Sequence, residues 1–253
     1  MMASIPLLVA HRGYPARYPE NSLDGLEAAV QAGACWVEFD VQLCADGVPV
    51  VLHDATLQRT AARSACIMDL PSSQLADISV HEPARFGAGS KSVILPTLAQ
   101  ALALLARWPR VQAFVEIKEE SLARFGVETT LRAVIDVIRA QSVPCTLISY
   151  AAEILAPARL AGLTTGWVLR QWDALTQRMA EIEAPDYLIC NHRRLPLTAE
   201  QIWQGPWHWV SYEVSDPELA LALATRGVEL IETDAIGAML DHPLLRTRNC
   251  LDE

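Results

Sequence analysis

Short runs of apolar residues alternate with longer amphipathic segments along most of this chain. Leu7–Ala10 is the first apolar run, and Leu23–Ala32 is the first amphipathic segment. Asn21 or Ser22 is suited to cap the start of this segment, and Gly33 is suited to end it. The pattern therefore predicts a strand followed by a helix, which is the unit of a parallel α/β fold.

The same alternation continues to residue 233. It predicts further strands at 36–41, 111–117, 146–150, 165–169, 187–190, 207–214 and 228–233. It predicts further helices at 98–107, 127–141, 151–160, 175–180, 199–203 and 216–226. Eight strands that alternate with helices indicate an α/β protein with a (β/α)8 TIM barrel, whose active site lies at the C-terminal ends of the strands. An open doubly wound sheet is the alternative architecture.

A hairpin interrupts the alternation after the second strand. The link at 44–49 is too short for a parallel crossover, which needs about a dozen residues, so the chain must turn back on itself. Asp46-Gly47 is a favoured pair for a two-residue type I′ turn. Pairing outward from this turn sets Asp40 opposite His53.

The segment that follows the hairpin is irregular. Residues 55–96 contain several prolines and glycines, and they predict a small inserted lobe that roofs or flanks the barrel mouth. The length of 253 residues fits either one domain or two. With the barrel pattern, we expect one domain over residues 1–253 that includes this lobe.

Composition and charge exclude some classes of protein. Hydrophobic residues make up 51% and charged residues 20% of the chain, which supports a packed interior rather than disorder. The formal net charge of −10 disfavours nucleic acid as a partner, because such binding requires a basic surface. Neither the G-x-G-x-x-G nor the P-loop motif follows any predicted strand, so nothing indicates a dinucleotide or nucleoside triphosphate site.

The sequence also bears on membranes and compartment. It contains no run of about 18 apolar residues, and its first residues lack the basic and apolar regions of a signal peptide. The six cysteines are spaced singly, with no C-x-x-C pair, and we expect reduced thiols. We therefore expect a cytoplasmic protein without stable membrane insertion. Nothing in the pattern indicates an oligomeric state.

Acidic residues gather at the ends of two predicted strands. Strand alternation puts Glu38 and Asp40 on one face, and it puts Glu116 with Lys118 on one face of the third strand. A single such carboxylate is usually a solvated charge or half of a salt bridge. Three carboxylates that converge at a barrel mouth repel one another unless a cation lies among them. Ligation by oxygen alone favours Mg²⁺ or Ca²⁺ over zinc.

Two histidines are directed to the same place. His11 directly follows the first strand, and His53 ends the hairpin arm. Asp54 follows His53 and could orient its ring. Although a lone histidine at a strand end is usually structural, two beside three carboxylates suggest catalysis. The other histidines are expected to be structural or exposed, and they are His81, His192, His208 and His242.

Nine short motifs, taken in order, resemble the glycerophosphodiester phosphodiesterase family. They are His11-Arg12-Gly13, Pro19-Glu20-Asn21-Ser22, Glu38-Phe39-Asp40-Val41, Asp46-Gly47, His53-Asp54, Leu57-x-Arg59-Thr60, Pro96-Thr97-Leu98, Glu116-Ile117-Lys118 and Thr233-Asp234. The resemblance extends over nearly the whole chain. It implies a (β/α)8 barrel with a small insertion that hydrolyses glycerophosphodiesters to sn-glycerol 3-phosphate and an alcohol.

The resemblance also implies roles for particular residues. It implies Glu38, Asp40 and Glu116 as ligands of one divalent ion, Mg²⁺ or Ca²⁺, His11 and His53 as the acid–base pair, and Arg12 and Lys118 as phosphate contacts. His53 could also approach the metal. The family usually has Trp-Thr-Val-Asn where this chain has Tyr212-Glu213-Val214-Ser215, so Tyr212 keeps an aromatic wall for substrate and adds a hydroxyl.

Three functions are consistent with these residues. The resemblance favours hydrolysis of a small glycerophosphodiester, in which the glycerol hydroxyl attacks first and water opens the cyclic phosphate. Direct attack by water is the mechanistic alternative. A lysophospholipase D or phospholipase-like enzyme that acts on lipid is the second function, although residues 54–96 show no long apolar face. A catalytically silent barrel that binds phosphorylated metabolites is the third.

Overall fold

Nine strands form one sheet in the described part of the chain, which comprises residues 5–87, 91–196 and 202–248 of a computed structural model. The strands are β1 (Leu7–Ala10), β2 (Trp36–Leu43), β3 (Pro49–Val51), β4 (Gln112–Ile117), β5 (Cys145–Ser149), β6 (Thr164–Leu169), β7 (Tyr187–Asn191), β8 (His208–Tyr212) and β9 (Leu230–Thr233). Their order is β1-β9-β8-β7-β6-β5-β4-β2-β3, and an additional β1–β2 pairing closes the sheet. All pairings except β2–β3 are parallel. The predicted (β/α)8 barrel is confirmed.

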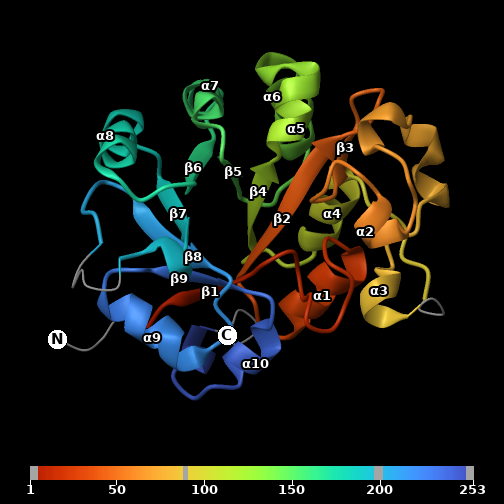
Figure 1. Ribbon diagram of the computed structural model, residues 1–253. Helices are drawn as coiled ribbons and strands as arrows, with labels where there is room; N and C mark the ends of the chain where they lie inside the picture. Colours follow the sequence, from red (N-terminus) through yellow and green to blue (C-terminus); the bar gives the residue numbers. More distant parts are fainter. Residues whose placement is uncertain (1–4, 88–90, 197–201, 249–253) are drawn as a thin grey trace.

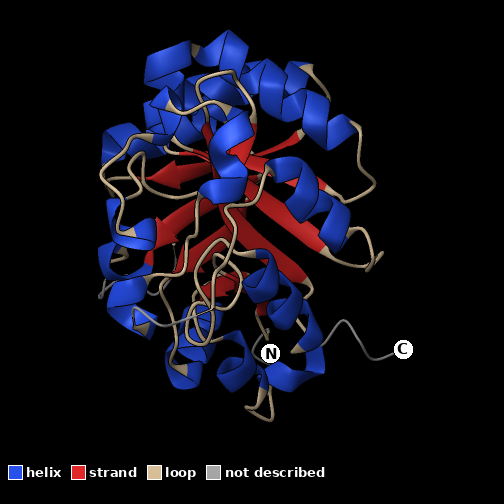
Figure 2. Cartoon of the chain, turned by 90° about the vertical axis from the view of Figure 1, so that its right-hand side faces the viewer, coloured by secondary structure: helices blue, strands red, loops and turns tan. Residues whose placement is uncertain are grey.

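Helices surround the strands on the outside of the barrel (Figures 1 and 2). The α-helices are α1 (Leu23–Gln31), α2 (Gln58–Ala61), α3 (Pro83–Phe86), α4 (Leu98–Leu105), α5 (Glu119–Phe125), α6 (Val127–Arg139), α7 (Leu155–Leu160), α8 (Ala174–Glu183), α9 (Pro217–Thr225) and α10 (Ile236–Leu240). The 3-10 turns are η1 (Ile67–Asp69), η2 (Ser72–Asp77), η3 (Ala152–Ile154), η4 (His192–Arg194) and η5 (Leu245–Arg248). None of the helices in these described ranges has the length and hydropathy needed to cross a bilayer.

The predicted helices are present with shifted ends, apart from one. The helix expected at 199–203 falls mainly on residues 197–201, which lie outside the described residues. Helix α5 was not predicted, because only Ser121 and Leu122 are buried in it and it therefore shows little apolar periodicity. Ser22 caps α1 by accepting a hydrogen bond from the Gly25 amide, which matches one of the two expected caps.

Two apolar layers place the functional end of the barrel. Between the sheet and the helices, outward-facing side chains of β2 such as Phe39 pack with α1 and α4. Inside the barrel, a second cluster is formed by Val9, Trp36, Phe114, Ile148, Val168, Ile189, Val210, Tyr212 and Leu230. Because these side chains fill the interior, polar side chains at the C-terminal strand ends lie above an apolar floor.

The register of the β2–β3 hairpin differs from the prediction by one residue. Leu52, and not His53, lies opposite Asp40, and the Leu52 amide donates a hydrogen bond of 3.0 Å to the Asp40 carbonyl. The expected pairing of Asp40 with His53 is therefore wrong. His53 lies one position farther along the returning arm.

The turn itself explains this shift. Gly47 has a φ of +79°, and its amide donates to the Cys44 carbonyl at 2.9 Å. The Cys44 amide in turn donates to the Val48 carbonyl at 3.1 Å. Three residues, not two, thus form the loop, which is the type I turn with a left-handed glycine that is common in such hairpins.

The described residues of the inserted segment, 55–87 and 91–96, lie at the side of the barrel next to β3 (Figure 1). Their described part has an apolar cluster of its own, which also includes residues of the hairpin. The cluster consists of Cys44, Val50, Leu52, Leu57, Ile67, Leu75, Ile78, Val80 and Leu95. Packing on the hairpin therefore ties this segment to the arm that carries His53.

The cysteines do not all match the expectation. Cys44, Cys66, Cys145 and Cys190 are free thiols, whereas Cys35 is disulfide-bonded. The expectation of reduced thiols is wrong for Cys35, because spacing along a chain does not show which segments the fold brings together.

Gly13 is where the loop after β1 packs on α1. Its φ is +86°, and a Cβ there would lie 2.8 Å from the Gly25 carbonyl carbon and 2.9 Å from the Leu26 nitrogen. We expect Gly13→Ala to lower the free energy of unfolding by about 2–4 kcal/mol, through backbone strain and overpacking. Urea denaturation measures this. The matched control is Gly47→Ala, where φ is also positive but nothing lies within 4 Å. Equal losses in both variants would contradict the role of the close packing.

Candidate active site

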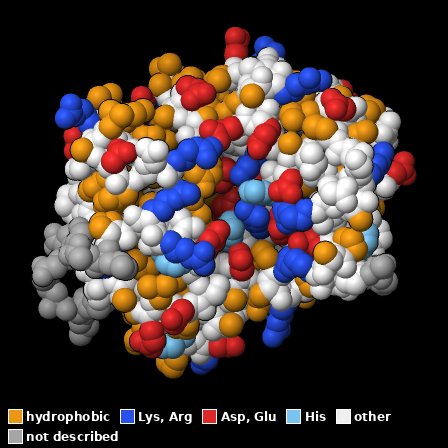
Figure 3. Space-filling model, viewed as in Figure 1, with side chains coloured by type: hydrophobic (Ala, Val, Ile, Leu, Met, Phe, Trp, Pro, Cys, Tyr) orange, Lys and Arg blue, Asp and Glu red, His pale blue; other side chains and the backbone are white. Residues whose placement is uncertain are grey.

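A hollow at the C-terminal ends of the strands holds histidine and acidic side chains, with basic side chains around its rim (Figure 3). The cavity there has a volume of about 280 Å³. Its polar lining includes the predicted residues His11, Arg12, His53, Glu116, Lys118 and Tyr212. Its apolar lining consists of Ile148, Val168 and Ile189.

Three carboxylates meet beside this cavity. Glu38 and Asp40 lie on β2, and Asp40 pairs in register with Glu116 on β4. One oxygen from each of the three carboxylates lies within 4.8 Å of the others. The Oε1 atom of Glu38 is buried and has no hydrogen-bond partner among the described residues. The structure thus brings the three predicted ligands together.

Burial and charge set the protonation of this cluster. Burial and the charge of Asp40 raise the pKa of Glu38 well above its usual range. Burial likewise raises the pKa of Glu116, although Lys118 opposes the shift. Burial favours a higher pKa for Asp40 as well, but the positive charges of Arg12 and Lys118 outweigh it and hold the pKa of Asp40 well below its usual range. A divalent cation would relieve the repulsion that shifts Glu38.

Asn21 positions Asp40 from the loop before α1. Its side-chain NH2 group donates a hydrogen bond of 2.8 Å to Asp40 Oδ2. Its side-chain oxygen accepts a hydrogen bond of 3.1 Å from the Asp40 backbone amide. Asn21 has a φ of +56°, a left-handed conformation that asparagine tolerates better than most residues. This double contact fixes the orientation of the Asp40 carboxylate.

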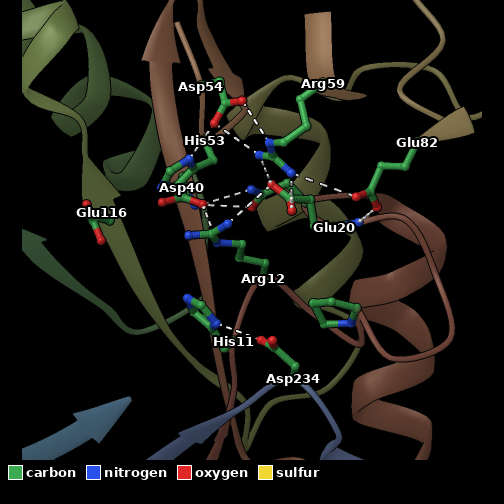
Figure 4. Close-up of polar contacts among 12 residues, drawn as sticks. His11, Arg12, Glu20, Asp40, His53, Asp54, Arg59, Glu82, Glu116 and Asp234 are labelled. Carbon is green, nitrogen blue, oxygen red and sulfur yellow. Dashed lines mark hydrogen bonds and ion pairs between the residues drawn. The ribbon is translucent and has the colours of Figure 1, made fainter. Parts of the chain in front are cut away.

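Each candidate catalytic histidine is oriented by an aspartate (Figure 4). His53 Nδ1 donates to Asp54 Oδ1 at 2.7 Å, and His11 Nδ1 donates to Asp234 Oδ1 at 2.8 Å. Asp54 thus orients His53 as predicted. Both rings keep Nε2 for other partners, and His11 Nε2 lies 3.8 Å from Glu38 Oε2. Although burial lowers the pKa of His11, the hydrogen bond to Asp234 raises it above the ordinary value overall.

The cations of the site are paired with its acids. Arg12 Nε lies 3.1 Å from Asp40 Oδ2, and Lys118 Nζ lies 2.8 Å from Glu116 Oε1. Lys118 also reaches Asp40 at 3.3 Å. Arg12 and Lys118 both line the cavity, so a phosphate group there would meet two ordered positive charges.

A second network joins the inserted segment to the site (Figure 4). Arg59 donates to both carboxylate oxygens of Glu20 at 2.7 Å, and its Nε donates to Asp54 at 2.8 Å. Glu82 is buried and accepts a hydrogen bond of 2.8 Å from the Glu20 amide. Asp54 is thus held by Arg59 on one side while it orients His53 on the other.

Tyr212 forms the opposite wall together with Tyr150. Their hydroxyl groups are 2.7 Å apart and share a hydrogen bond. Burial raises the pKa of both phenols, and the hydrogen bond with Tyr150 raises that of Tyr212 further. This wall is therefore aromatic and uncharged at neutral pH.

Sequence reasoning missed two acidic residues of this site. In the sequence Asp234 stands out only as part of the Thr233-Asp234 motif, because its approach to His11 depends on barrel closure between β9 and β1. Glu232 belongs to none of the motifs, although alternation along the predicted strand puts it on the inner face with Leu230. Glu232 is 3% exposed and lines the cavity. Burial raises its pKa to about 7.

Comparison with known proteins agrees with this geometry. The sequence model of the Glycerophosphoryl diester phosphodiesterase family matches residues 11–157, which is more than half of the chain. The chain belongs to this family. The matched region contains both candidate catalytic histidines and the three clustered carboxylates.

Individual members of the family match parts of the chain. A Mycobacterium tuberculosis protein named "Probable glycerophosphodiester phosphodiesterase 1" is 34% identical over 141 residues, which are 53% of this chain and 51% of that protein. A Bacillus altitudinis glycerophosphodiester phosphodiesterase is 31% identical over 133 residues, which are 51% and 52% of the two chains. The chain thus spans about half the length of the curated relatives it matches.

Solved structures share the fold over nearly the whole chain. An Oleispira antarctica phosphodiesterase in complex with the product sn-glycerol-3-phosphate has a TM-score of 0.81 at 24% identity, and covers 94% of this chain and 96% of its own. A glycerophosphodiester phosphodiesterase from Parabacteroides distasonis has a TM-score of 0.78 at 22% identity, and the match covers 97% of this chain and 98% of that one. These structures support the barrel architecture of the family in this chain.

Proposed function

We propose that this protein is a metal-dependent glycerophosphodiester phosphodiesterase, which releases sn-glycerol 3-phosphate and an alcohol. The observation that carries the proposal is the joint placement of two aspartate-oriented histidines and three carboxylates beside one cavity. The family membership and the names of the relatives support the same activity. A small-molecule diester fits a cavity of about 280 Å³.

Glu38, Asp40 and Glu116 are the residues that would hold the metal ion. Their donor set consists of oxygen atoms alone, and the unpartnered Oε1 of Glu38 is available for a cation. Such a set suits Mg²⁺ or Ca²⁺. When bound, the ion supplies Lewis-acid stabilisation of negative charge on phosphoryl and hydroxyl oxygens.

The remaining roles fall to residues around the cavity. Arg12 and Lys118 contact the phosphate and stabilise the charge that develops on its oxygens. One of the pair His11 and His53 removes the proton from the glycerol hydroxyl as its oxygen attacks phosphorus, and the other protonates the leaving alcohol oxygen. Water then opens the cyclic phosphate with the two histidine roles exchanged, so that one ring removes a proton from water and the other returns a proton to the glycerol oxygen. Tyr212 and Tyr150 flank the bound diester.

A diester panel tests this proposal. We expect purified protein with Mg²⁺ or Ca²⁺ to release sn-glycerol 3-phosphate from glycerophosphocholine and glycerophosphoethanolamine, in amounts equal to the free alcohol. An enzyme-coupled assay for sn-glycerol 3-phosphate and chromatography of the alcohol measure the two products. Lysophosphatidylcholine is the comparison substrate. Turnover of the lysolipid without turnover of its deacylated form would instead establish the lipid-directed activity.

A further inference from the structure

Glu232 is a buried carboxyl group that the proposed mechanism does not use. It lies at the C-terminal end of β9, is 3% exposed and forms part of the cavity lining. Its Oε1 atom is buried and has no hydrogen-bond partner among the described residues. A buried unpaired acceptor costs about 1–3 kcal/mol, so a polar partner from a ligand would be favourable here.

The strand register places Glu232 at the level of Glu38 inside the barrel. Glu232 pairs with Val9 on β1, and Val9 pairs with Trp36 on β2. Trp36 precedes Glu38 by one inward-facing position. Because the strands of a closed barrel tilt, each of these two pairings steps down by about one residue, so Glu232 is level with Glu38. The other cavity residues toward the interior include Ile148 and Val168, which are apolar. Glu232 therefore lies beside the carboxylate cluster, at the boundary between the charged groups of the site and its apolar lining.

The neighbouring cations are ion-paired with carboxylates other than Glu232. Arg12 is paired with Asp40 and Glu20, and Lys118 is paired with Glu116 and Asp40. His11 Nδ1 is bonded to Asp234. No hydrogen bond within the described ranges reaches the Glu232 side chain from these groups, so a ligand that donates to this carboxyl group would displace no protein donor.

The chemistry of this position selects the kind of ligand group. A phosphate or carboxylate would be repelled by Glu232 and by the nearby cluster. An apolar group would leave the acceptor unpaired. A hydroxyl group fits, because it donates to a carboxyl oxygen in either protonation state of the carboxyl. The glycerol unit carries a terminal hydroxyl besides the one that attacks phosphorus.

We propose that Glu232 determines specificity for the glycerol unit by accepting a hydrogen bond from its terminal hydroxyl. This inference rests on the proposed function. It predicts that the enzyme distinguishes glycerophosphocholine from 2-hydroxyethyl phosphocholine, which keeps the attacking hydroxyl but lacks the hydroxymethyl group. Sites built to bind a hydroxyl reject analogues that lack it, and we expect a preference of about 10- to 100-fold in kcat/KM.

Variants of Glu232 test the inference through this preference. Glu232→Leu should lower kcat/KM for glycerophosphocholine by about 10- to 100-fold and leave that for the hydroxyethyl analogue within about 3-fold. Glu232→Gln keeps an acceptor oxygen and should retain most of the preference. The matched control is Glu213→Gln, which removes an exposed carboxylate from the rim of the same cavity and should not change the preference.

Two further measurements separate this role from others. Thermal unfolding should show no loss of stability in Glu232→Leu, because an apolar side chain replaces a buried unpaired carboxyl. If that variant does not fold, Glu232→Met supplies the same test with an unbranched side chain. Calorimetric titration with Mg²⁺ alone, or Ca²⁺ alone, should give the wild-type affinity.

Several results would overturn the inference. Equal losses on both substrates would mean that Glu232 acts through His11, and a loss of metal affinity would mean that it serves the ion. A wild-type enzyme that hydrolyses both substrates equally well would exclude the preference itself. In contrast, a wild-type protein that hydrolyses no diester would refute the proposed function, and the inference would fall with it.

Discussion

Removal of divalent cations is expected to lower kcat/KM for glycerophosphocholine by about 1000-fold or more. Without a divalent cation, the entering phosphodiester anion meets three carboxylates whose charge Arg12 and Lys118 offset only in part. Dialysis against EDTA followed by the assay for sn-glycerol 3-phosphate measures the loss. Separate additions of Mg²⁺, Ca²⁺ and Mn²⁺ should restore activity to different extents and identify the preferred ion.

The same cation should stabilise the fold. A ligand that binds only the folded state at about 100 times its dissociation constant adds about 2.7 kcal/mol to the free energy of unfolding. Glu116→Gln should raise the cation concentration needed for both effects. The control is Glu229→Gln, since Glu229 precedes β9 and lies at the other end of the barrel beside His208. Full activity after chelation would exclude a catalytic metal.

Replacement of either cavity histidine, His11 or His53, is also expected to lower kcat strongly. We expect His11→Ala and His53→Ala each to lower kcat by about 10²- to 10⁴-fold, which is the usual contribution of a positioned general acid or base. Steady-state kinetics on glycerophosphocholine measures this effect. Metal affinity and thermal stability should stay near the wild-type values, because neither ring belongs to the three-carboxylate cluster.

His208→Ala is the matched control for these variants. His208 begins β8, is exposed and pairs with Glu229, far from the C-terminal strand ends. Its replacement should leave kcat unchanged. Retained turnover in both cavity variants would contradict the assignment of the acid–base pair. Retained metal binding with no turnover in the wild-type protein would instead favour a silent binding barrel.

The residue pattern is sufficient to predict the barrel and to bring most residues of the candidate site to one end of it. Strand alternation alone placed Glu38 and Asp40 on one face, and the burial of Phe39 between sheet and helices confirms that alternation. Parallel strands bring their C-terminal ends to one mouth, so Glu116 could be expected beside them. These inferences needed only the period of two residues and the direction of the strands.

Other features depend on geometry that the residue pattern does not encode. Asp46-Gly47 is compatible with a two-residue or a three-residue loop, and the hydrogen bonds between Cys44 and both Gly47 and Val48 decide for the three-residue loop. The contact of His11 with Asp234 requires β9 to close on β1, which joins residues 223 positions apart. Glu232 does not stand out in the sequence, because a single acidic residue in a strand is usually exposed. Here it alternates with Thr233 and shares the barrel-facing side of β9 with Leu230.

The bridge from Arg59 to Glu20 and Asp54 limits how the inserted segment can be exchanged. Since Glu82 also accepts from the Glu20 amide, the segment touches the loop that carries Arg12 and the arm that carries His53. A segment grafted from another barrel would have to bring an arginine and a buried glutamate to these same positions. The inserted segment therefore helps to position the candidate catalytic groups, and recombination cannot replace it freely with a segment from another barrel.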